Sequence, residues 1–330
     1  MLVSEIYLPI ISDYGTFADV KWLVLILVLA PVLLARGQQT NVVSAVPGTN
    51  GAAVLDAVEV QYRSLVAADA LALAEVEQWV QGGGGAALRK RIDERFAGVA
   101  RAYEGFLKQH PDHARARVAF GNFLNESGDE VAATGQWEKA LVSDPKDAEI
   151  WNNLANVFGH RGPAKKAFEY YAKAVELAPN EATYYQNFAT TMFLFRKDAR
   201  EFYHITEAEV FDRALHLYRQ AIALEPDNYE LAMDVAQCYY SVKPPRLAEA
   251  VTAWNYALQI APNNLQRENA HIHLARFKMR EGLFQEARQH LGVITNAFNE
   301  TVRVRVLRDL EAREKKAGQT GKGALPVPFN

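Results

Sequence analysis

The sequence lacks most of the chemistry on which metal sites and disulfide-stabilised folds depend. It has one cysteine, Cys238, which excludes an internal disulfide and a cluster of thiolates around zinc or iron. We expect Cys238 to be a small buried residue on a helix. The sequence also contains no Gly-rich phosphate loop, nucleophile elbow or paired-carboxylate signature. These absences predict that the protein has no cofactor, no metal site and no catalytic residues.

A strong charge of one sign is absent as well. The 36 basic and 39 acidic residues are interspersed and leave a formal net charge of −3. Such a balance gives no field that would attract a nucleic acid, so we expect no nucleic-acid partner. The histidines offer no metal-binding motif either. His271 and His273 are two residues apart, which directs them to different sides of a helix, and the others, such as His290, are dispersed.

Apolar residues make up 49% of the 330 positions, which is enough to bury a core without disulfides or a metal. One uncharged apolar segment, residues 22–35, lies between Lys21 and Arg36. It is shorter than the about 20 residues that cross a membrane comfortably, and it fits the apolar region of a secretory signal better. We therefore expect residues 1–37 to be a signal peptide or, alternatively, an uncleaved N-terminal membrane anchor.

The flanks of this segment suggest where the mature protein begins. Gly37 and Ala45 each end a triplet that places small or compact residues where signal peptidase needs them, so we expect cleavage after one of them, with Gly37 preferred. Acidic residues precede Lys21, which is unusual for a signal, so translation from Val20 is a further hypothesis. All of these interpretations predict export, to the periplasm or outside the cell, or anchoring in a membrane through residues 22–35.

Composition also divides the chain before its main repeat region. Residues 38–51 are polar, contain Gly and Pro and have no period, which predicts a linker. Residues 52–111 are expected to form an N-terminal helical region, because residues 52–80 contain no Pro or Gly and are rich in helix formers. The consecutive glycines at 82–85 predict a flexible joint before a second helix at about residues 87–109.

A 34-residue period begins at Ala114. Pro145 and Pro179 lie 34 residues apart, and aligning the chain on them brings similar residues into register. In the first unit, residues 114–147, positions 4, 7, 8, 11, 20, 24, 27 and 32 hold Arg117, Phe120, Gly121, Leu124, Ala133, Trp137, Ala140 and Pro145. In the second unit, residues 148–181, the same positions hold Trp151, Leu154, Ala155, Phe158, Ala167, Tyr171, Ala174 and Pro179.

This pattern resembles the tetratricopeptide repeat, and the match continues along the chain. A third unit begins at Ala182 and is interrupted by an insertion at residues 196–205, a fourth begins at Tyr229, and a fifth begins at Glu268. A degenerate half-unit precedes them within residues 52–111. The resemblance implies an all-α fold, a right-handed α-solenoid of about five stacked helix hairpins with N-terminal helices before them.

The resemblance also sets the limits of the solenoid. It implies hairpins over residues 112–294. Residues 295–316 include a charged helix with apolar residues on one stripe, which we expect to cap the open end of the array, since each repeat exposes apolar surface to the next. Residues 317–330 are polar and marked by Pro and Gly, so we expect a disordered tail there.

The residue types of the repeat have a physical reason. Paired helices approach most closely at positions 8 and 20, where only Gly or Ala fits, and position 27 must be small because the next unit leans on it. Position 15 lies in the turn and holds Gly128, Gly162 and Gly282, where a positive φ costs glycine little. The sequence therefore predicts a buried small residue at every close contact between helices.

In the family, the first helix of each hairpin lines a concave groove that binds an extended peptide or a partner helix. The resemblance implies that positions 5, 6 and 9, which are mostly amides here, face this groove. An amide suits a peptide backbone, because it offers two donors and an acceptor without a charge. The alternative is that asparagine at these positions serves the repeat fold itself. The candidates for contact with a protein or peptide are Asn122, Asn152, Asn153, Asn156, Gln186, Asn187, Asp234 and Gln237.

The insertion in the third unit is the least repeat-like segment. It contains Arg200, Phe202 and Tyr203, which are residue types typical of a partner surface. Thr206 and Glu209 follow in a capping-box pattern that predicts the start of the second helix. The alternative is that the insertion lengthens both helices of its hairpin and buries its aromatic residues locally.

The sequence favours a protein-interaction scaffold, exported or membrane-tethered, that recruits a protein or peptide partner. A structural spacer or oligomerisation module is the first alternative, and the oligomeric state does not follow from the sequence. An enzyme with a site in the N-terminal helical region is the second alternative. Because repeat folds do not fix their ligands, the sequence does not identify the partner.

Overall fold

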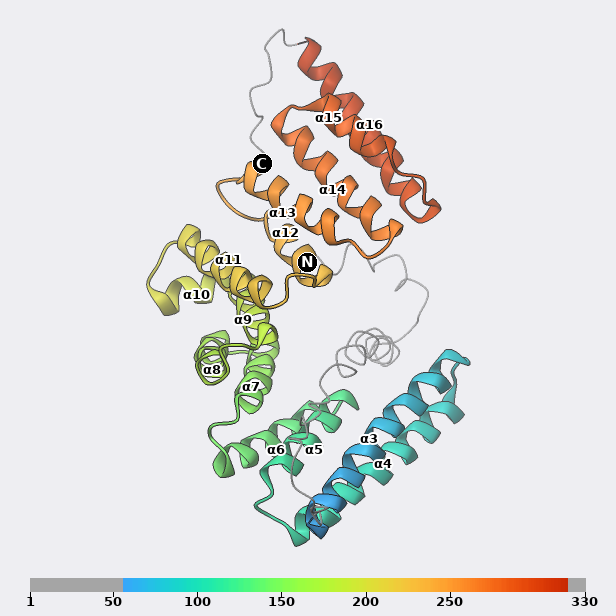
Figure 1. The fold of residues 1–330 in the computed structure, drawn as a ribbon, viewed down its shortest axis with the longest axis vertical. Helices are drawn as coiled ribbons and strands as arrows, with labels where there is room; N and C mark the ends of the chain where they lie inside the picture. Colours follow the sequence, from blue (N-terminus) through green and yellow to red (C-terminus); the bar gives the residue numbers. More distant parts are fainter. Residues whose placement is uncertain (1–55, 320–330) are drawn as a thin grey trace, which may run out of the picture. The chain divides into compact units, whose positions relative to one another are not determined.

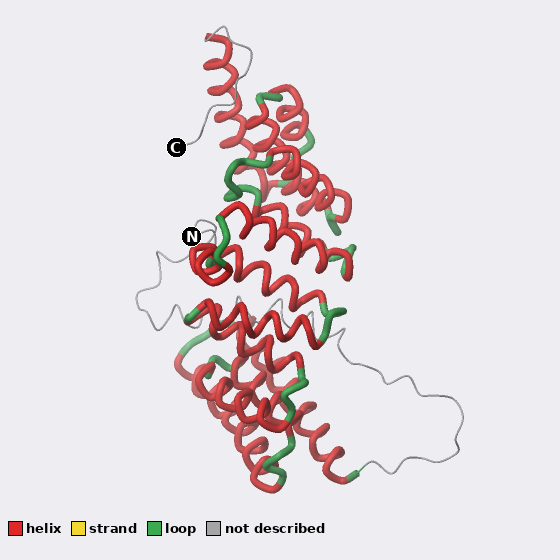
Figure 2. Tube along the Cα trace, turned by 90° about the vertical axis from the view of Figure 1, so that its left-hand side faces the viewer, coloured by secondary structure: helices red, strands yellow, loops and turns green. Residues whose placement is uncertain are grey.

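The computed structural model describes residues 56–319, and all regular structure there is helical. These residues form fourteen helices, α3 to α16, and no strand (Figure 2). The chain divides after Ile150 into two compact units, which we call unit 1 (described residues 56–150) and unit 2 (residues 151–319). The expected signal or anchor and the linker lie outside the described residues. None of the described helices is long and apolar enough to cross a membrane.

Unit 1 begins with two long helices. α3 (Ala57–Gln81) and α4 (Ala86–Gln109) run antiparallel, side by side, with the glycines at 82–85 between them (Figure 1). Asp56 caps α3, because its carboxylate accepts a hydrogen bond from the backbone N–H of Val58. Apolar residues fill the space along these helices, among them Leu73, Val76, Ile92, Phe96 and Val99.

The first hairpin of the repeat follows in unit 1. α5 (Ala114–Glu126) and α6 (Glu130–Ser143) are joined by a tight turn in which Gly128 has a φ of 92°. The positive φ predicted at position 15 is thus present, and glycine adopts it without the steric cost of a Cβ. Gly121 of α5 lies directly against the ring of Trp137 on α6, so the two helices approach each other at position 8.

A matched pair of substitutions tests this approach. A Cβ added at Gly121 would lie 2.5 Å from Nε1 and 2.7 Å from Cδ1 of Trp137, whose buried ring has little room to move. At Gly135, on α6, nothing lies within 4 Å of an added Cβ. We expect Gly121→Ala to lower the free energy of unfolding by about 1–3 kcal/mol through overpacking. Gly135→Ala should raise it by up to about 1 kcal/mol through helix propensity.

Urea titration followed by circular dichroism measures both variants. Opposite signs are expected although the two substitutions are chemically identical. Stabilisation of the protein by both alanines would contradict the close contact at position 8.

Unit 2 continues the repeat with alternating first and second helices. α7 (Ala148–Arg161) starts in unit 1 and continues into unit 2, where its Asn156 bonds to Tyr171 of α8. Successive hairpins of the unit pack on one another. The next helices in chain order are α8 (Ala164–Leu177), α9 (Ala182–Leu194), α10 (Arg196–Tyr203), α11 (Glu207–Leu224), α12 (Tyr229–Cys238), α13 (Leu247–Ile260), α14 (Asn264–Glu281) and α15 (Phe284–Gly292).

The small residues of unit 2 lie where the period predicts them. Gly162 and Gly282, in the turns, have φ angles of 75° and 79°. The alanines at positions 8, 20 and 27 have no exposed surface, and they are Ala155, Ala189, Ala236, Ala275, Ala167, Ala214, Ala250, Ala287, Ala174, Ala221 and Ala257. Helices that meet at such alanines can approach closely and bury the large residues beside them. The predicted all-α solenoid of stacked helix hairpins is confirmed.

The insertion of the third hairpin forms a helix of its own. α10 stands between α9 and α11, and the backbone of Phe195 leaves the helical conformation at its start. His204 ends α10 with a φ of 54°. The capping box predicted at Thr206 and Glu209 is present, since the hydroxyl accepts from the N–H of Glu209 and the carboxylate accepts from that of Thr206.

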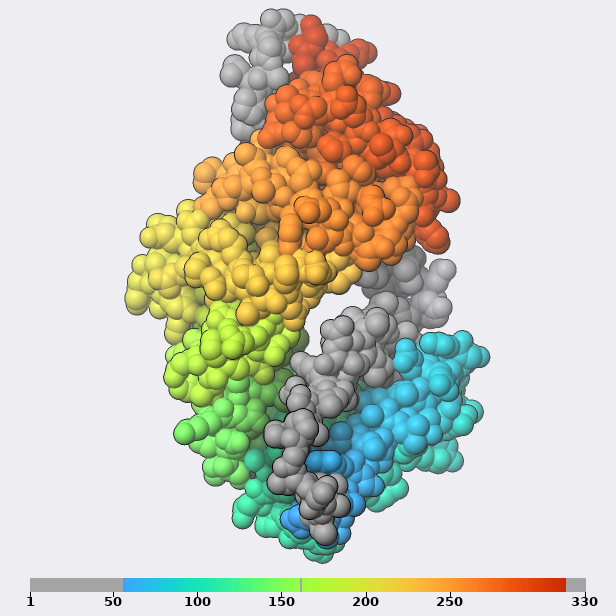
Figure 3. Space-filling model, in the orientation of Figure 1, coloured from blue at the N-terminus to red at the C-terminus, as the bar shows by residue number. Residues whose placement is uncertain are grey.

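The last helix covers the fifth hairpin. α16 (Ala297–Gln319) packs Val306 and Leu310 into a core with Ile272 and Leu291. Figure 3 shows this end of unit 2, in orange and red, as one closely packed body. The helix runs past residue 316, so residues 317–319 are its last residues and not part of the expected disordered tail, and no proline stops the helix before them. Residues 320–330 lie outside the described residues.

Candidate protein-binding surface

Four of the polar residues predicted for the groove form a ladder between successive first helices of unit 2. Asn187 on α9 donates a hydrogen bond to Oδ1 of Asn152 on α7, over 3.0 Å. Gln186 on α9 donates to Oδ2 of Asp234 on α12, also over 3.0 Å. Each bond joins position 5 of one hairpin to position 6 of the next. We call these four residues the polar ladder; Asn152 is 5% exposed and the other three are half-buried.

Asparagine at position 9 serves its own hairpin. Asn122 accepts a hydrogen bond from the indole N–H of Trp137 at 3.1 Å, and this pair lies in unit 1. Asn156 accepts one from the hydroxyl of Tyr171 at 2.6 Å, in unit 2. In both hairpins position 9 thus satisfies the polar atom of the large ring at position 24, which would otherwise be buried without a partner. This bears out the alternative that the fold itself uses these amides.

The pairing of positions 9 and 24 changes in later hairpins. In the third hairpin position 9 is Thr190, whose hydroxyl lies 2.8 Å from that of Tyr218 at position 24. The hydrogen bond between positions 9 and 24 is thus kept, with threonine in place of asparagine. In the fourth hairpin Gln237 occupies position 9, yet Nε1 of the buried Trp254 has no hydrogen-bond partner among the described residues. The side chain of Gln237 therefore forms no hydrogen bond with Trp254.

Two further bonds involve the predicted amides. Asn122 also donates to a carboxylate oxygen of Glu149 over 2.7 Å. Asn153 accepts from the amide nitrogen of Asn152 over 3.4 Å, which connects it to the polar ladder. The ladder and Asn153 thus form a polar row made of two hydrogen-bonded groups, Asn153 with Asn152 and Asn187, and Gln186 with Asp234. Asn122 belongs to unit 1.

Two carboxylates on α12 give the ladder its charge. Burial raises the pKa of Asp234, and the hydrogen bond from Gln186 opposes that rise. Burial and the neighbouring Asp234 together raise the pKa of Glu230. Neither carboxylate forms an ion pair with a basic side chain among residues 56–319. A positively charged group brought to this row would favour the ionised form of both.

The predicted residues of the insertion lie on α10. The rings of Phe202 and Tyr203 contact that of Phe168 on α8, with centroids 5.8 Å and 5.9 Å away. Arg200 is exposed. The aromatic residues are thus packed locally, as the alternative has it, but against a different hairpin. Contact of this segment with a partner stays a prediction.

The structure corrects the prediction that the histidines are dispersed. His271 on α14 and His290 on α15 meet with their Nδ1 atoms 2.9 Å apart, because the two helices pair in one hairpin. In the part of the chain that the structure describes, no group of three or more His, Cys, Asp or Glu side chains is placed to hold a metal ion. Cys238 is buried as predicted, and burial raises the pKa of its thiol to about 12.

The sequence is similar to known proteins over its repeat region. The family profile of the tetratricopeptide repeat matches residues 132–182 and 207–264. The photosystem I assembly protein Ycf3 of Rippkaea orientalis is 31% identical over 149 residues, which are 42% of this chain and 83% of that protein. Ycf3 of Cyanophora paradoxa is 30% identical over 149 residues, again 42% of this chain and 83% of that protein.

Similarity also extends to solved structures. The structure of PilF from Pseudomonas aeruginosa matches with a TM-score of 0.50 at 15% sequence identity, covering 72% of this chain and 91% of PilF. At that identity the similarity concerns the fold alone. It agrees with the stacked helix hairpins described above.

Proposed function

The chain belongs to the tetratricopeptide-repeat family, whose members act as scaffolds for protein interactions, and from this premise we propose that it holds an extended segment of a partner protein along the polar ladder. The observation that carries the proposal is the polar row on α7, α9 and α12, in which two hydrogen-bonded pairs join successive first helices. Its amides keep spare capacity, because Gln186 and Asn187 each use one donor in the ladder and an amide has two.

The charge of the row suggests the chemistry of the partner segment. Asp234 accepts a hydrogen bond from the half-buried Gln186, and Glu230 lies one turn before it on α12. Neither carboxylate has a basic partner among the described residues. A lysine or arginine of a bound segment would supply that partner, while the amides bind its backbone. We therefore propose a positively charged, extended segment as the occupant.

The relatives support a role in assembly. Both are named for the assembly of a complex, photosystem I. We propose that this chain likewise holds a subunit while a larger complex is built, without assigning it the same complex.

The place of action is also a proposal. Residues 22–35, between Lys21 and Arg36, support a scaffold that is exported or tethered to a membrane. Fractionation of cells with carbonate extraction, together with mass spectrometry of the N-terminal peptide, tests it. A protein found in the cytosol with its peptide starting at Met1 would contradict export and tethering alike.

Site-specific photo-crosslinking tests the binding surface. A photoreactive amino acid at Asn153 or Gln237 lies on the ladder side of the first helices, whereas one at Glu176 lies on the exposed surface of the second helix α8. We expect the same partner to be captured from the first two positions, with little capture from Glu176. Asp234→Asn should lower the yield at least about fivefold if a charge-assisted hydrogen bond is lost.

The other candidate functions predict different results. Equal capture from all three positions, or none from any, would contradict binding along the ladder. Cross-links only between copies of this chain would identify the oligomerisation module instead. A small molecule that raises the melting temperature while no protein is captured would favour the enzyme.

A further inference from the structure

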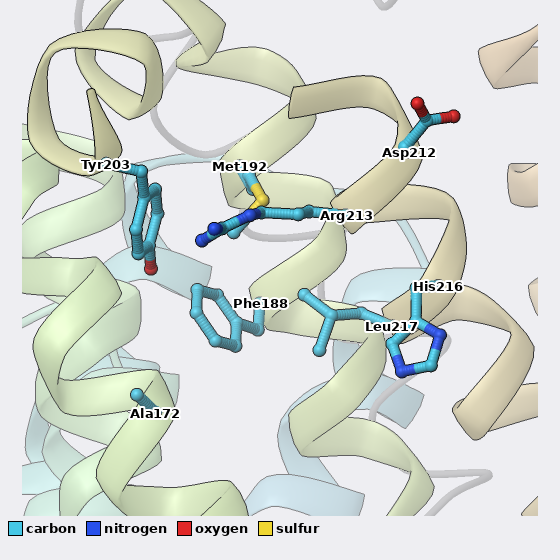
Figure 4. Close-up of a pocket in the computed structure, with 8 residues that line it drawn as sticks. All are labelled: Ala172, Phe188, Met192, Tyr203, Asp212, Arg213, His216 and Leu217. Atoms are coloured by element: carbon cyan, nitrogen blue, oxygen red, sulfur yellow. The ribbon is translucent and has the colours of Figure 1, made fainter. Parts of the chain in front are cut away.

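A cavity of about 450 Å³ opens in unit 2 beside the insertion. Figure 4 shows it between α8, α10 and α11, with α9 behind. Phe188 and Met192 of α9 and Leu217 of α11 give it apolar walls, and Tyr203 of α10 closes one side. Because Tyr203 belongs to the insertion, that segment supplies one wall of this cavity.

One cation faces the cavity without a compensating carboxylate. The guanidinium of Arg213 reaches into it from α11, whereas the carboxylate of Asp212 points away (Figure 4) and pairs with Arg246 at 2.6 Å. Glu209, one turn before Arg213, instead accepts from the N–H and the hydroxyl of Thr206, both at 2.7 Å. Among the described residues Arg213 forms no ion pair. Its positive charge is therefore available to a ligand.

A second donor lies opposite this cation. The guanidinium of Arg213 sits 4.7 Å from the ring centroid of Tyr203. Burial raises the pKa of Tyr203 to about 12, partly offset by Arg213, while Glu169 adds to the rise. The hydroxyl therefore stays protonated near neutral pH, and no described residue is its hydrogen-bond partner. Two donors thus stand over an apolar cavity and offer a carboxylate charge-assisted hydrogen bonds.

We propose that this cavity binds a part of the partner protein in which an apolar side chain stands next to a carboxylate. The apolar side chain fills the space against Phe188, Met192 and Leu217, and the carboxylate lies on Arg213 and Tyr203. The proposal deepens the proposed function, on which it rests. It gives the partner a second, acidic and apolar contact in addition to the basic segment at the polar ladder.

The test uses methionine methyl NMR on the full chain. Met192 lines the cavity, while Met233 and Met279 lie elsewhere in unit 2 and serve as internal controls. The probes are acetylglutamyl-phenylalaninamide and its neutral counterpart acetylglutaminyl-phenylalaninamide. We expect the acidic probe to shift the Met192 signal, leave that of Met279 in place, and bind about tenfold more tightly than the neutral probe.

Two arginine variants provide the matched comparison. Arg213→Gln should remove the preference for the acidic probe, whereas Arg219→Gln, at another exposed arginine of α11, should keep it. Both side chains are exposed, and the Met279 signal reports whether each variant is folded. A Met192 signal that does not move, or equal affinity for the two probes, would overturn the proposal.

A third probe separates a partner side chain from a free organic acid. If 4-phenylbutyrate binds far more tightly than the acidic dipeptide, the cavity is a small-molecule site and the assignment to a partner protein is wrong. The titrations need no partner, so their failure leaves the crosslinking result at the ladder untouched. Failure at the ladder would in turn leave the affinity of the cavity measurable.

Discussion

Glu268→Ala is expected to lower the free energy of unfolding of unit 2 by about 3 kcal/mol and to loosen the first turn of α16. Glu268 lies on α14 and is 2% exposed. Its carboxylate accepts from the backbone N–H groups of Thr295 and Asn296, at 2.9 Å and 3.0 Å, and from the amide of Asn299 at 3.2 Å. Without it these donors lose their acceptor, at about 1–3 kcal/mol for each one left unsatisfied.

Hydrogen exchange measured by mass spectrometry shows the effect where it arises. Peptides from the start of α16 should exchange faster in Glu268→Ala, and the urea midpoint should fall. The urea midpoint of Glu268→Gln should lie between those of Glu268→Ala and the wild type, because glutamine keeps one acceptor oxygen. The control is Asp309→Ala, an exposed carboxylate paired with Arg313 at 3.0 Å, which should cost about 0.5 kcal/mol or less. Unchanged protection in Glu268→Ala would show that α16 is held by its apolar stripe alone.

Acidification from neutral pH to about pH 5 should destabilise unit 2 by about 2 kcal/mol through His273. This histidine of α14 stacks on Trp254 with centroids 4.0 Å apart and lies 2.7 Å from the hydroxyl of Tyr240. Burial, with a smaller contribution from the charge of Arg276, lowers the pKa of His273 from 6.5 to about 3. At about pH 5 His273 is therefore protonated in the unfolded chain but neutral in the folded chain. Stability is complete above pH 6.5 and is lost as the pH falls from 6.5 toward 3.

Urea unfolding at a series of pH values measures this slope. His273→Phe keeps a ring on Trp254 but has no titrating group, so its stability should depend less on pH. Burial also lowers the pKa values of His271 and His290, which should leave a smaller slope of the same sign. An undiminished slope in His273→Phe would assign the acid sensitivity to other groups.

Glu268 adds a separate effect at lower pH. Burial alone would raise the pKa of its carboxyl, but the N–H groups of Thr295 and Asn296 outweigh it and hold the pKa at about 2, below the usual 4.5. Its contribution is complete above pH 4.5 and is lost as the pH falls toward 2. The two groups thus act in different parts of an acid titration.

The sequence predicted the fold because helix packing in a repeat leaves a local trace. Alanine at position 8 or 20 is required by the contact with the neighbouring helix of the hairpin, and its recurrence every 34 residues is visible without coordinates. The break at Phe195 was not predictable in this way. No Gly or Pro marks it, and the insertion was expected either to lengthen its neighbours or to face a partner, whereas it forms a separate helix packed on α8.

The candidate site was predicted less fully, for a physical reason. The sequence identified the amides, but their partners depend on how adjacent hairpins are rotated. Gln186 meets Asp234 only because position 5 of one hairpin lies against position 6 of the next. The cavity left even less trace, since Arg213 is uncompensated only when Asp212 is taken by Arg246. These contacts join residues from different helices, and no single segment of the sequence predicts which of them will meet.

α16 also decides what this end of the solenoid shows to another molecule. Its apolar residues Val306 and Leu310 pack against the last hairpin. Its outward surface carries exposed charges, among them Arg305, Arg308, Glu311 and Lys315. A second copy that packed against this surface would have to desolvate these charged side chains, which costs free energy. It would also lack the buried alanine contacts that join successive hairpins of unit 2.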